Sequence, residues 1–228
     1  MKYTTNQRWI KVCGLLLLVL TTTASDAIAQ VGLGADVMNR YVWRGADFGN
    51  SPSIQPDINF TSGNFEIGAW AAFATNGNPD GTEVDFYTSY TFSTSRGDLS
   101  LMLTDYTFPQ APEGNYFSGS AHFLEAGFQY SGTEQFPINL FTGVFLTNDD
   151  DTSVYTQIGY GIRNVELFMG FTPSKSELYG TGKAGVIHTG ISVTNPVPVT
   201  EFFSVIVNGT LAANPYSDNF FFLFGIGF

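Results

Sequence analysis

The last ten residues of the chain read N-F-F-F-L-F-G-I-G-F and constrain the fold more than any other segment. In an extended strand successive side chains point to opposite faces, so every even position from Phe220 to Phe228 would present an apolar side chain on one face. The other face carries Asn219, Phe221, Leu223, Gly225 and Gly227. A soluble domain would have to bury such a strand, whereas a membrane barrel can turn its apolar face to lipid. With Gly225 and Gly227 on the inner face, we expect open space in the lumen there.

The same alternation of apolar and polar residues recurs along the chain. It predicts twelve strands, at residues 31–44, 54–60, 65–74, 83–92, 99–108, 121–130, 136–146, 153–162, 165–171, 184–194, 202–211 and 219–228. After residue 30 no apolar run is long enough to span a bilayer as a helix, so a membrane protein of this sequence would have to cross as strands. We therefore expect an all-β fold, a transmembrane antiparallel β-barrel of twelve strands, with ten or fourteen as alternatives.

The amino terminus has the form of a secretory signal. Three basic residues in positions 2–11 precede a short apolar run at 12–20, and Ala27-Ile28-Ala29 has the small-x-small pattern of a signal-peptidase site. This predicts a cleaved signal peptide at residues 1–29 and a barrel domain at 30–228. Cys13, the only cysteine, lies inside the predicted signal, so we expect a mature protein without a thiol.

The charge of the predicted mature chain excludes one class of partner. Lys2, Arg8, Lys11 and Asp26 precede Gln30, so six basic and nineteen acidic residues remain, a net charge of −13. Nucleic-acid binding needs clustered Lys and Arg, which this chain lacks, whereas an acidic pore would favour cations. We expect no cofactor and no metal. The run at 149–151 could bind Ca²⁺ but lacks the Gly and Glu of an EF-hand spacing, which favours a solvated acidic loop.

The lengths of the connections provide evidence that does not depend on hydrophobicity. Short connections alternate with longer ones, as in outer-membrane barrels, which have short periplasmic turns, longer outer loops and both termini on the periplasmic side. A soluble sandwich has no reason to sort its loops in this way. Tyr41 and Trp43 near one rim, with Phe60 and Phe65 near the other, would form two aromatic girdles. We expect a location in the bacterial outer membrane, with its lipid and lipopolysaccharide as surroundings.

Several segments resemble a known family. The run from Asn39 to Gly45, N-R-Y-V-W-R-G, followed by P-S-I-Q-P-D at 52–57, is similar to the opening of the TorF-like porins, bacterial outer-membrane barrels that carry the Gcw_chp domain name. E-V-D-F-Y at 83–87 and Y-T-F-P at 106–109, with Glu125 downstream, also fit that family. The resemblance implies an outer-membrane barrel with porin activity. Separately, the final strand ending in Phe228 resembles the signal that the barrel-assembly machinery recognises.

Polar residues on the predicted inner faces are the candidate functional residues. The lumen-lining candidates are Asp36, Arg40, Arg44, Gln55, Asp57, Glu66, Glu83, Asp85, Glu125, Gln129, Gln157, Glu166 and His188. Folding the hairpins about their loop centres places Arg40 opposite Asp57 and Glu166 opposite His188. These groups either satisfy one another inside a narrow barrel or form a filter that selects ions and polar solutes.

The pattern therefore predicts a porin-like channel for passive diffusion of ions or small polar solutes, not an enzyme. A closed structural or adhesive barrel without transport is the main alternative, because a bore of this strand number can be plugged by side chains. A barrel hydrolase is a further alternative. Ser120 and His122 are the nearest approximation to a nucleophile with its base, and no orienting acid is evident. The oligomeric state is left open.

Overall fold

A computed structural model describes residues 29–110 and 116–228. The predicted signal peptide lies outside the described residues except for Ala29. Within the described part, no helix is long and apolar enough to cross a bilayer. The strands are β1 (Gln30–Met38), β2 (Tyr41–Trp43), β3 (Ala46–Phe48), β4 (Ser53–Ser62), β5 (Phe65–Ala74), β6 (Thr82–Thr94), β7 (Gly97–Thr107), β8 (Phe123–Thr133), β9 (Phe136–Phe145), β10 (Val154–Ile162), β11 (Val165–Thr172), β12 (Gly185–Pro198), β13 (Ser204–Asn214) and β14 (Asn219–Gly227). Two 3₁₀ turns, η1 (Pro79–Gly81) and η2 (Gly119–Ala121), lie in the connections.

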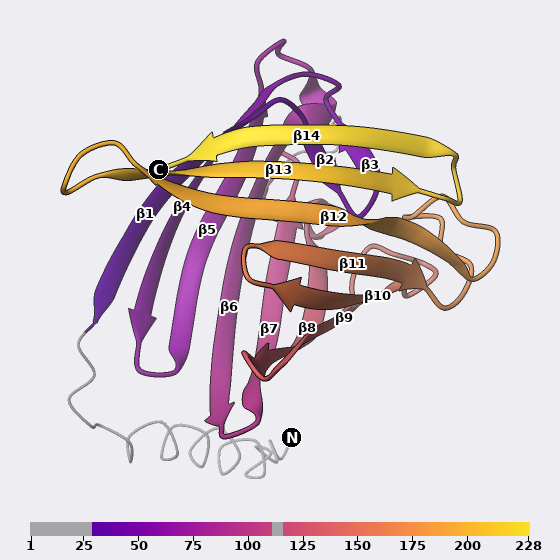
Figure 1. Ribbon diagram of the computed structural model, residues 1–228. Helices are drawn as coiled ribbons and strands as arrows, with labels where there is room; N and C mark the ends of the chain where they lie inside the picture. The colour runs from indigo at the N-terminus through magenta and orange to yellow at the C-terminus, as the bar shows by residue number, and fades with distance from the viewer. Residues whose placement is uncertain (1–28, 111–115) are drawn as a thin grey trace, which may run out of the picture.

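Twelve of these strands form a closed antiparallel barrel. β1 pairs with β4 on one side and with β14 on the other, and every remaining neighbour in the wall is also its neighbour in sequence (Figure 1). The predicted fold class and the predicted strand number are both confirmed. One strand was predicted too long: the segment 31–44 contains the wall strand β1 and also β2, which pairs with β3 in a separate hairpin.

The connections sort to the two ends of the barrel. Two-residue turns at 63–64, 95–96, 134–135 and 163–164 and the turn at 199–203 lie at one end, which we call the short-turn end. The other connections, at 39–52, 75–81, 108–122, 146–153, 173–184 and 215–218, lie at the opposite end, which we call the long-loop end because all but the last are longer than any turn at the short-turn end. β1 begins and β14 finishes toward the short-turn end, because antiparallel strands alternate in direction around the wall.

The outer face of the wall is apolar. Alternate residues of the strands expose large hydrophobic side chains, such as Leu33 at 75%, Leu101 at 55% and Phe222 at 60%. Their polar neighbours in the sequence point inward and are partly or fully covered. The period of two in the sequence thus corresponds to the two faces of the wall. A contiguous apolar exterior on a monomer of this size marks a surface that meets lipid or another protein.

The β2–β3 hairpin folds into the barrel instead of extending the wall. Its two-residue turn consists of Arg44 and Gly45, both at positive φ (48° and 80°), which is the combination that a type I′ turn requires. In Figure 1 the hairpin lies behind β13 and β14. The side-chain amide of Asn214, at the end of β13, donates to the carbonyl of Gly45 at 3.1 Å. The tip of the hairpin therefore reaches β13, the second strand along the wall from β1.

The seam between β1 and β14 is shorter than any other in the wall. The two strands register only over Asp36–Met38 and Gly225–Gly227, with further main-chain bonds between Ala35 and Phe228. The predicted open space at Gly225 and Gly227 is not there, because a Cβ at either position would collide with the side chain of Met38 or Asp36. The two glycines instead allow β1 side chains to pack against β14.

Candidate functional site

An ion pair between the hairpin and the wall lies in the lumen. Arg44, at the hairpin turn, donates through Nη1 to Oε1 of Glu125 at 2.6 Å and through Nη2 to Oε2 at 2.8 Å. The side chains are 8% and 2% exposed. Nη1 also donates to the Tyr179 hydroxyl at 2.6 Å, and the Tyr106 hydroxyl donates to Glu125 at 2.9 Å. All oxygens of the carboxylate are therefore satisfied, as a buried charge requires.

Aromatic rings enclose the Arg44 guanidinium. Its central carbon lies 4.4 Å from the ring centroid of Trp43 and 4.5 Å from that of Tyr155. Such contacts attract a cation to the ring faces. Burial raises the pKa of Tyr179 to about 12 despite the opposing effect of the Arg44 charge, so this hydroxyl stays protonated at neutral pH. The aromatic cage of Trp43, Tyr155 and Tyr179 thus surrounds the Arg44 guanidinium with neutral groups, and Glu125 is the anion that pairs with it.

Close main-chain packing locates the hairpin tip. A Cβ on Gly45 would collide with the main-chain oxygen of Ile187 in β12, so only glycine permits this approach. Ile187 is the extra residue at an irregularity in the pairing of β11 with β12, where Gly170 pairs with His188 and Phe171 with Val186. The irregularity turns the Ile187 carbonyl toward the hairpin.

A second set of polar contacts anchors the base of the hairpin. The Tyr41 hydroxyl donates to Glu83 at 2.8 Å, and Glu83 lies beside Asp85 on the same face of β6. The two acids are only 3% and 6% exposed. Arg40 pairs with Asp47 of β3. Glu83 and Asp85 are therefore covered by the hairpin and do not face an open pore in this structure.

The hairpin separates two cavities. The inner cavity, of about 550 Å³, lies toward the short-turn end and is lined by the hairpin and by Gln129, Gln157, Glu166 and His188 among others. The outer cavity, of about 850 Å³, lies between the other side of the hairpin, the loop at 177–180 and β14. Among the described residues that line these cavities, none is shared between them. Arg44 lines the inner cavity and Tyr179 the outer one, and both line a third cavity of about 210 Å³ beside the hairpin.

The structure brings together five of the thirteen candidates around the inner cavity: Arg44, Gln129, Gln157, Glu166 and His188. The others lie on the inner wall or at the hairpin: Asp36, Arg40, Gln55, Asp57, Glu66, Glu83, Asp85 and Glu125. Asp36 registers with Gln55, and Glu66 registers with Thr61 near the short-turn end.

Both predicted pairings are wrong. Arg40 lies beyond the end of β1 and bonds to Asp47 and Asn50, whereas Asp57 registers with Gly34. The error arises because the hairpin takes up eight residues of the connection, so loop-centre folding does not give the register of β1 with β4.

The predicted pairing of Glu166 with His188 is wrong because β11 and β12 pair in a different register. Glu166 registers with Ser192 and accepts from Asn139 at 3.3 Å. His188 instead registers with Gly170, and its ring stacks on Phe168 with centroids 4.6 Å apart. Of the charged candidates, Arg44 and Glu125 satisfy each other, whereas Oδ1 of Asp85 is buried without a hydrogen-bond partner.

The aromatic part of the site was not predicted from the sequence. Tyr41 and Trp43 were assigned to an outer aromatic girdle, but Tyr41 is buried and Trp43 packs against Tyr106 with ring centroids 5.6 Å apart. Tyr106 and Tyr155 occupy inward positions of their strands, where the pattern otherwise places small or polar residues. These large aromatic residues at inward positions are the feature of the sequence that indicates a filled lumen.

The proposed hydrolase residues do not form a catalytic arrangement here. His122 bonds to Asp105 at 2.7 Å and to the carbonyl of Tyr116 at 2.6 Å, so an acid partner exists although none was evident from the sequence. The Ser120 hydroxyl pairs with that of Ser118 instead of with the imidazole. One ring nitrogen thus bonds to β7 and the other to the loop, which makes His122 a structural anchor of the long-loop end.

The acidic run at 149–151 stabilises loops. Asp149 accepts from the amide of Ser153, and Asp151 accepts from the amide of Glu177 at 2.7 Å and from Lys175 at 3.4 Å. Over residues 29–110 and 116–228, no group of three or more acidic, histidine or cysteine side chains is arranged to hold a metal ion.

Fold and lumen together define the class: a closed twelve-stranded β-barrel with an apolar exterior and a lumen divided by an inserted hairpin. No known family model matches the chain, and no curated protein sequence matches it. The resemblance to the TorF-like porins therefore stays a prediction from the sequence.

Proposed function

We propose that this protein is an outer-membrane channel for small polar solutes or ions and that the β2–β3 hairpin is its gate. The carrying observation is the position of Arg44, which bonds to Glu125 between two polar cavities on either side of the hairpin. In this proposal the structure is the closed state. Opening requires Arg44 to leave Glu125, and displacement of the whole hairpin also breaks the Tyr41–Glu83 and Asn214–Gly45 hydrogen bonds.

The apolar exterior and the sorted loops support the membrane location. Strands with lipid-compatible side chains outside and polar ones inside are what an outer-membrane barrel needs. On this proposal the short-turn end faces the periplasm, lipid and lipopolysaccharide surround the wall, and the assembly machinery recognises the strand ending at Phe228. Passive diffusion needs a wet lumen and no chemical step, so we expect no catalytic activity.

Planar-bilayer recording tests the channel. The unmodified protein should show rare or small unitary currents, and Arg44→Ala should open more often because the ion pair and the cage contacts are lost. Arg96→Ala is the matched control, since Arg96 lies exposed in a two-residue turn at the short-turn end. If folded Arg44→Ala carries no current, the protein is a closed structural barrel and the gate does not exist.

A further inference from the structure

The wall of the barrel is interrupted beside the outer half of β14. Continuing the register of β1 with β14 would place residues 39–44 opposite 219–224. The chain instead turns inward after Met38 to form the hairpin. Asn39 is the last residue to bond with β14, so Asn219–Phe222 has a wall neighbour only on the β13 side in the described structure.

Asn39 closes the end of the seam with its side chain. Its Nδ2 donates to the carbonyl of Phe222 at 2.9 Å, and its Oδ1 accepts from the amide of Phe224 at 2.9 Å. The side-chain amide thus replaces the next residue of a strand. Because main-chain groups alternate in direction along an antiparallel strand, the amides of Phe222 and Phe220 point to the same side, where the wall is missing.

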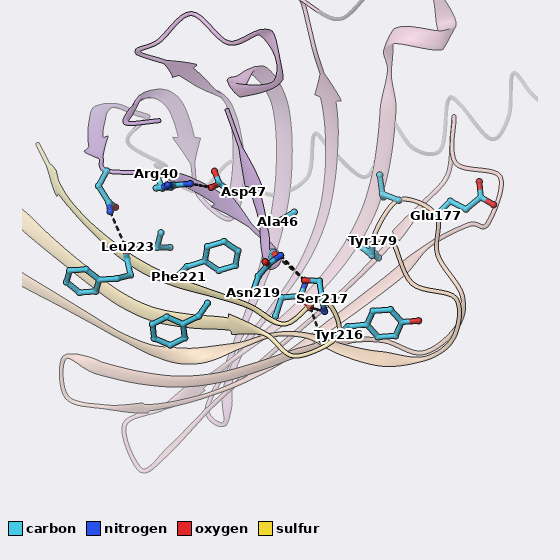
Figure 2. A pocket seen from close by; sticks show the side chains of 17 residues that line it. Arg40, Ala46, Asp47, Glu177, Tyr179, Tyr216, Ser217, Asn219, Phe221 and Leu223 are labelled. Carbon is cyan, nitrogen blue, oxygen red and sulfur yellow. Dashed lines mark hydrogen bonds and ion pairs between the residues drawn. The ribbon is translucent and has the colours of Figure 1, made fainter. Parts of the chain in front are cut away.

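The outer cavity reaches this interruption. Its lining includes Phe220 and Phe222, whose side chains point outward, and Phe221 and Leu223, whose side chains point inward. Because these consecutive residues form the edge of β14 that has no wall neighbour, the cavity lies against that edge. Figure 2 shows Phe221 and Leu223 on one side of the cavity and the Arg40–Asp47 pair on the other. The outer cavity therefore borders the interruption in the wall.

Polarity changes along the opening. On the outside are the exposed rings of Phe220 and Phe222, at 69% and 60% exposure. On the inside are Arg40 and Asp47, together with the main-chain amides along the unpaired edge of β14, while Ser217 lies exposed in the turn at the long-loop end. A main-chain donor that faces hydrocarbon without a partner costs several kcal/mol, so a polar group has to reach it. The volume of about 850 Å³ accommodates a ligand as well as water.

We propose that this opening binds a single-chain amphiphile from the membrane, with its hydrogen-bonding headgroup inside the lumen beside Arg40 and its hydrocarbon chain outside against Phe220 and Phe222. The inference rests on the proposed membrane location but not on channel activity. Apolar groups outside and donors and acceptors inside match the two ends of such a molecule. The occupant is distinct from the solute of the channel, because it enters through the wall.

Photolabelling tests the site. The folded protein in phospholipid vesicles is exposed to two palmitate analogues, one with a diazirine near the carboxylate and the other with a diazirine at the chain end. The first should label Arg40, Ala46 and Asp47, which line the outer cavity, and the second should label Phe220 and Phe222. Labelling by both probes that is confined to outward-facing residues around the whole barrel would overturn the proposal.

A matched pair of variants supplies the control. Ser217→Trp places a large ring in the opening and should abolish lumen labelling, whereas Ser204→Trp, at the exposed start of β13 near the short-turn end, should preserve it. Equal lumen labelling in both variants contradicts the site. Cross-linking of one copy to another through benzoylphenylalanine at position 222 would show that a second copy covers the opening, which also contradicts the proposal. Bilayer currents are measured separately, so failure of the channel leaves the labelling result interpretable.

Discussion

Arg44 and Glu125 form a bidentate ion pair across the lumen, with N–O distances of 2.6 and 2.8 Å. They are 81 residues apart in sequence, and Arg44 is not part of the wall. A bidentate guanidinium–carboxylate pair fixes orientation as well as distance. The hairpin is thus held in one position by a contact that removal of either charge would disrupt.

Removing one partner of this pair should destabilise the barrel more than removing both. Arg44→Met leaves the Glu125 carboxylate buried without a counter-ion, at a cost of about 3–5 kcal/mol, whereas Arg44→Met with Glu125→Leu removes both charges. The unfolding free energy in detergent, followed by the heat-dependent gel shift and by urea titration, checks this. If the single and the double variant have the same unfolding free energy, the ion pair is solvated and the buried geometry is wrong.

Gly45→Ala should displace the hairpin tip. Alanine disfavours the φ of 80°, and its Cβ meets the carbonyl oxygen of Ile187, so a cost of about 1–3 kcal/mol is expected. The variant should also show more frequent bilayer openings than the unmodified protein. Gly77→Ala is a matched control, because Gly77 also has positive φ but a Cβ there meets nothing within 4 Å. If the two variants open equally often, the position of the hairpin tip does not control the gate.

Asn39→Ala should weaken the closing seam. It removes a donor to Phe222 and an acceptor from Phe224, which leaves the main-chain groups of β14 without partners, at about 1–3 kcal/mol. Asn39→Asp keeps the acceptor and loses the donor, so its stability should lie between that of the unmodified protein and that of Asn39→Ala. Hydrogen exchange of the Phe224 amide measures the effect directly. Unchanged exchange in Asn39→Ala would show that the side chain does not complete the strand.

His122 should titrate above its ordinary pKa. The hydrogen bond to Asp105, with that to the Tyr116 carbonyl, favours the charged imidazole and raises its pKa above 6.5. The raised folded-state value means that this anchor contributes fully below pH 6.5 and is lost as the pH rises through the folded pKa. Nuclear magnetic resonance of the imidazole gives the value, and Asp105→Asn should lower it. A pKa at or below 6.5 in the unmodified protein contradicts the contact.

A cation on the outer face should oppose insertion. Ile158 is 43% exposed at the middle of β10, and Ile158→Arg should cost about 2–4 kcal/mol if this face meets hydrocarbon. Gln129→Arg is the control, because Gln129 lines the inner cavity. Folding yield and stability in lipid vesicles compare the two. If the two arginines are tolerated equally, the exterior does not face lipid.

The fold was accessible from the sequence because each wall residue has one of two environments. Alternation assigned outward and inward faces, and the sorted connection lengths identified the two ends of the barrel. The two-residue gap between the predicted strands 153–162 and 165–171 is at the right place, since Ile162 pairs with Val165 across it. The paired acids and bases were harder to predict, because register depends on the path of the connection between two strands.

By itself the sequence determined a closed antiparallel wall of twelve strands, since a repeated period of two, an apolar face and two-residue turns are local properties. Only the tertiary structure decided that the chain leaves the wall at Asn39 and that Tyr41, Trp43 and Arg44 fill the lumen. The physical reason is that the hairpin has the same period of two as the wall. An apolar side chain gains equally from leaving water for lipid or for a packed lumen, so the pattern alone does not distinguish the two.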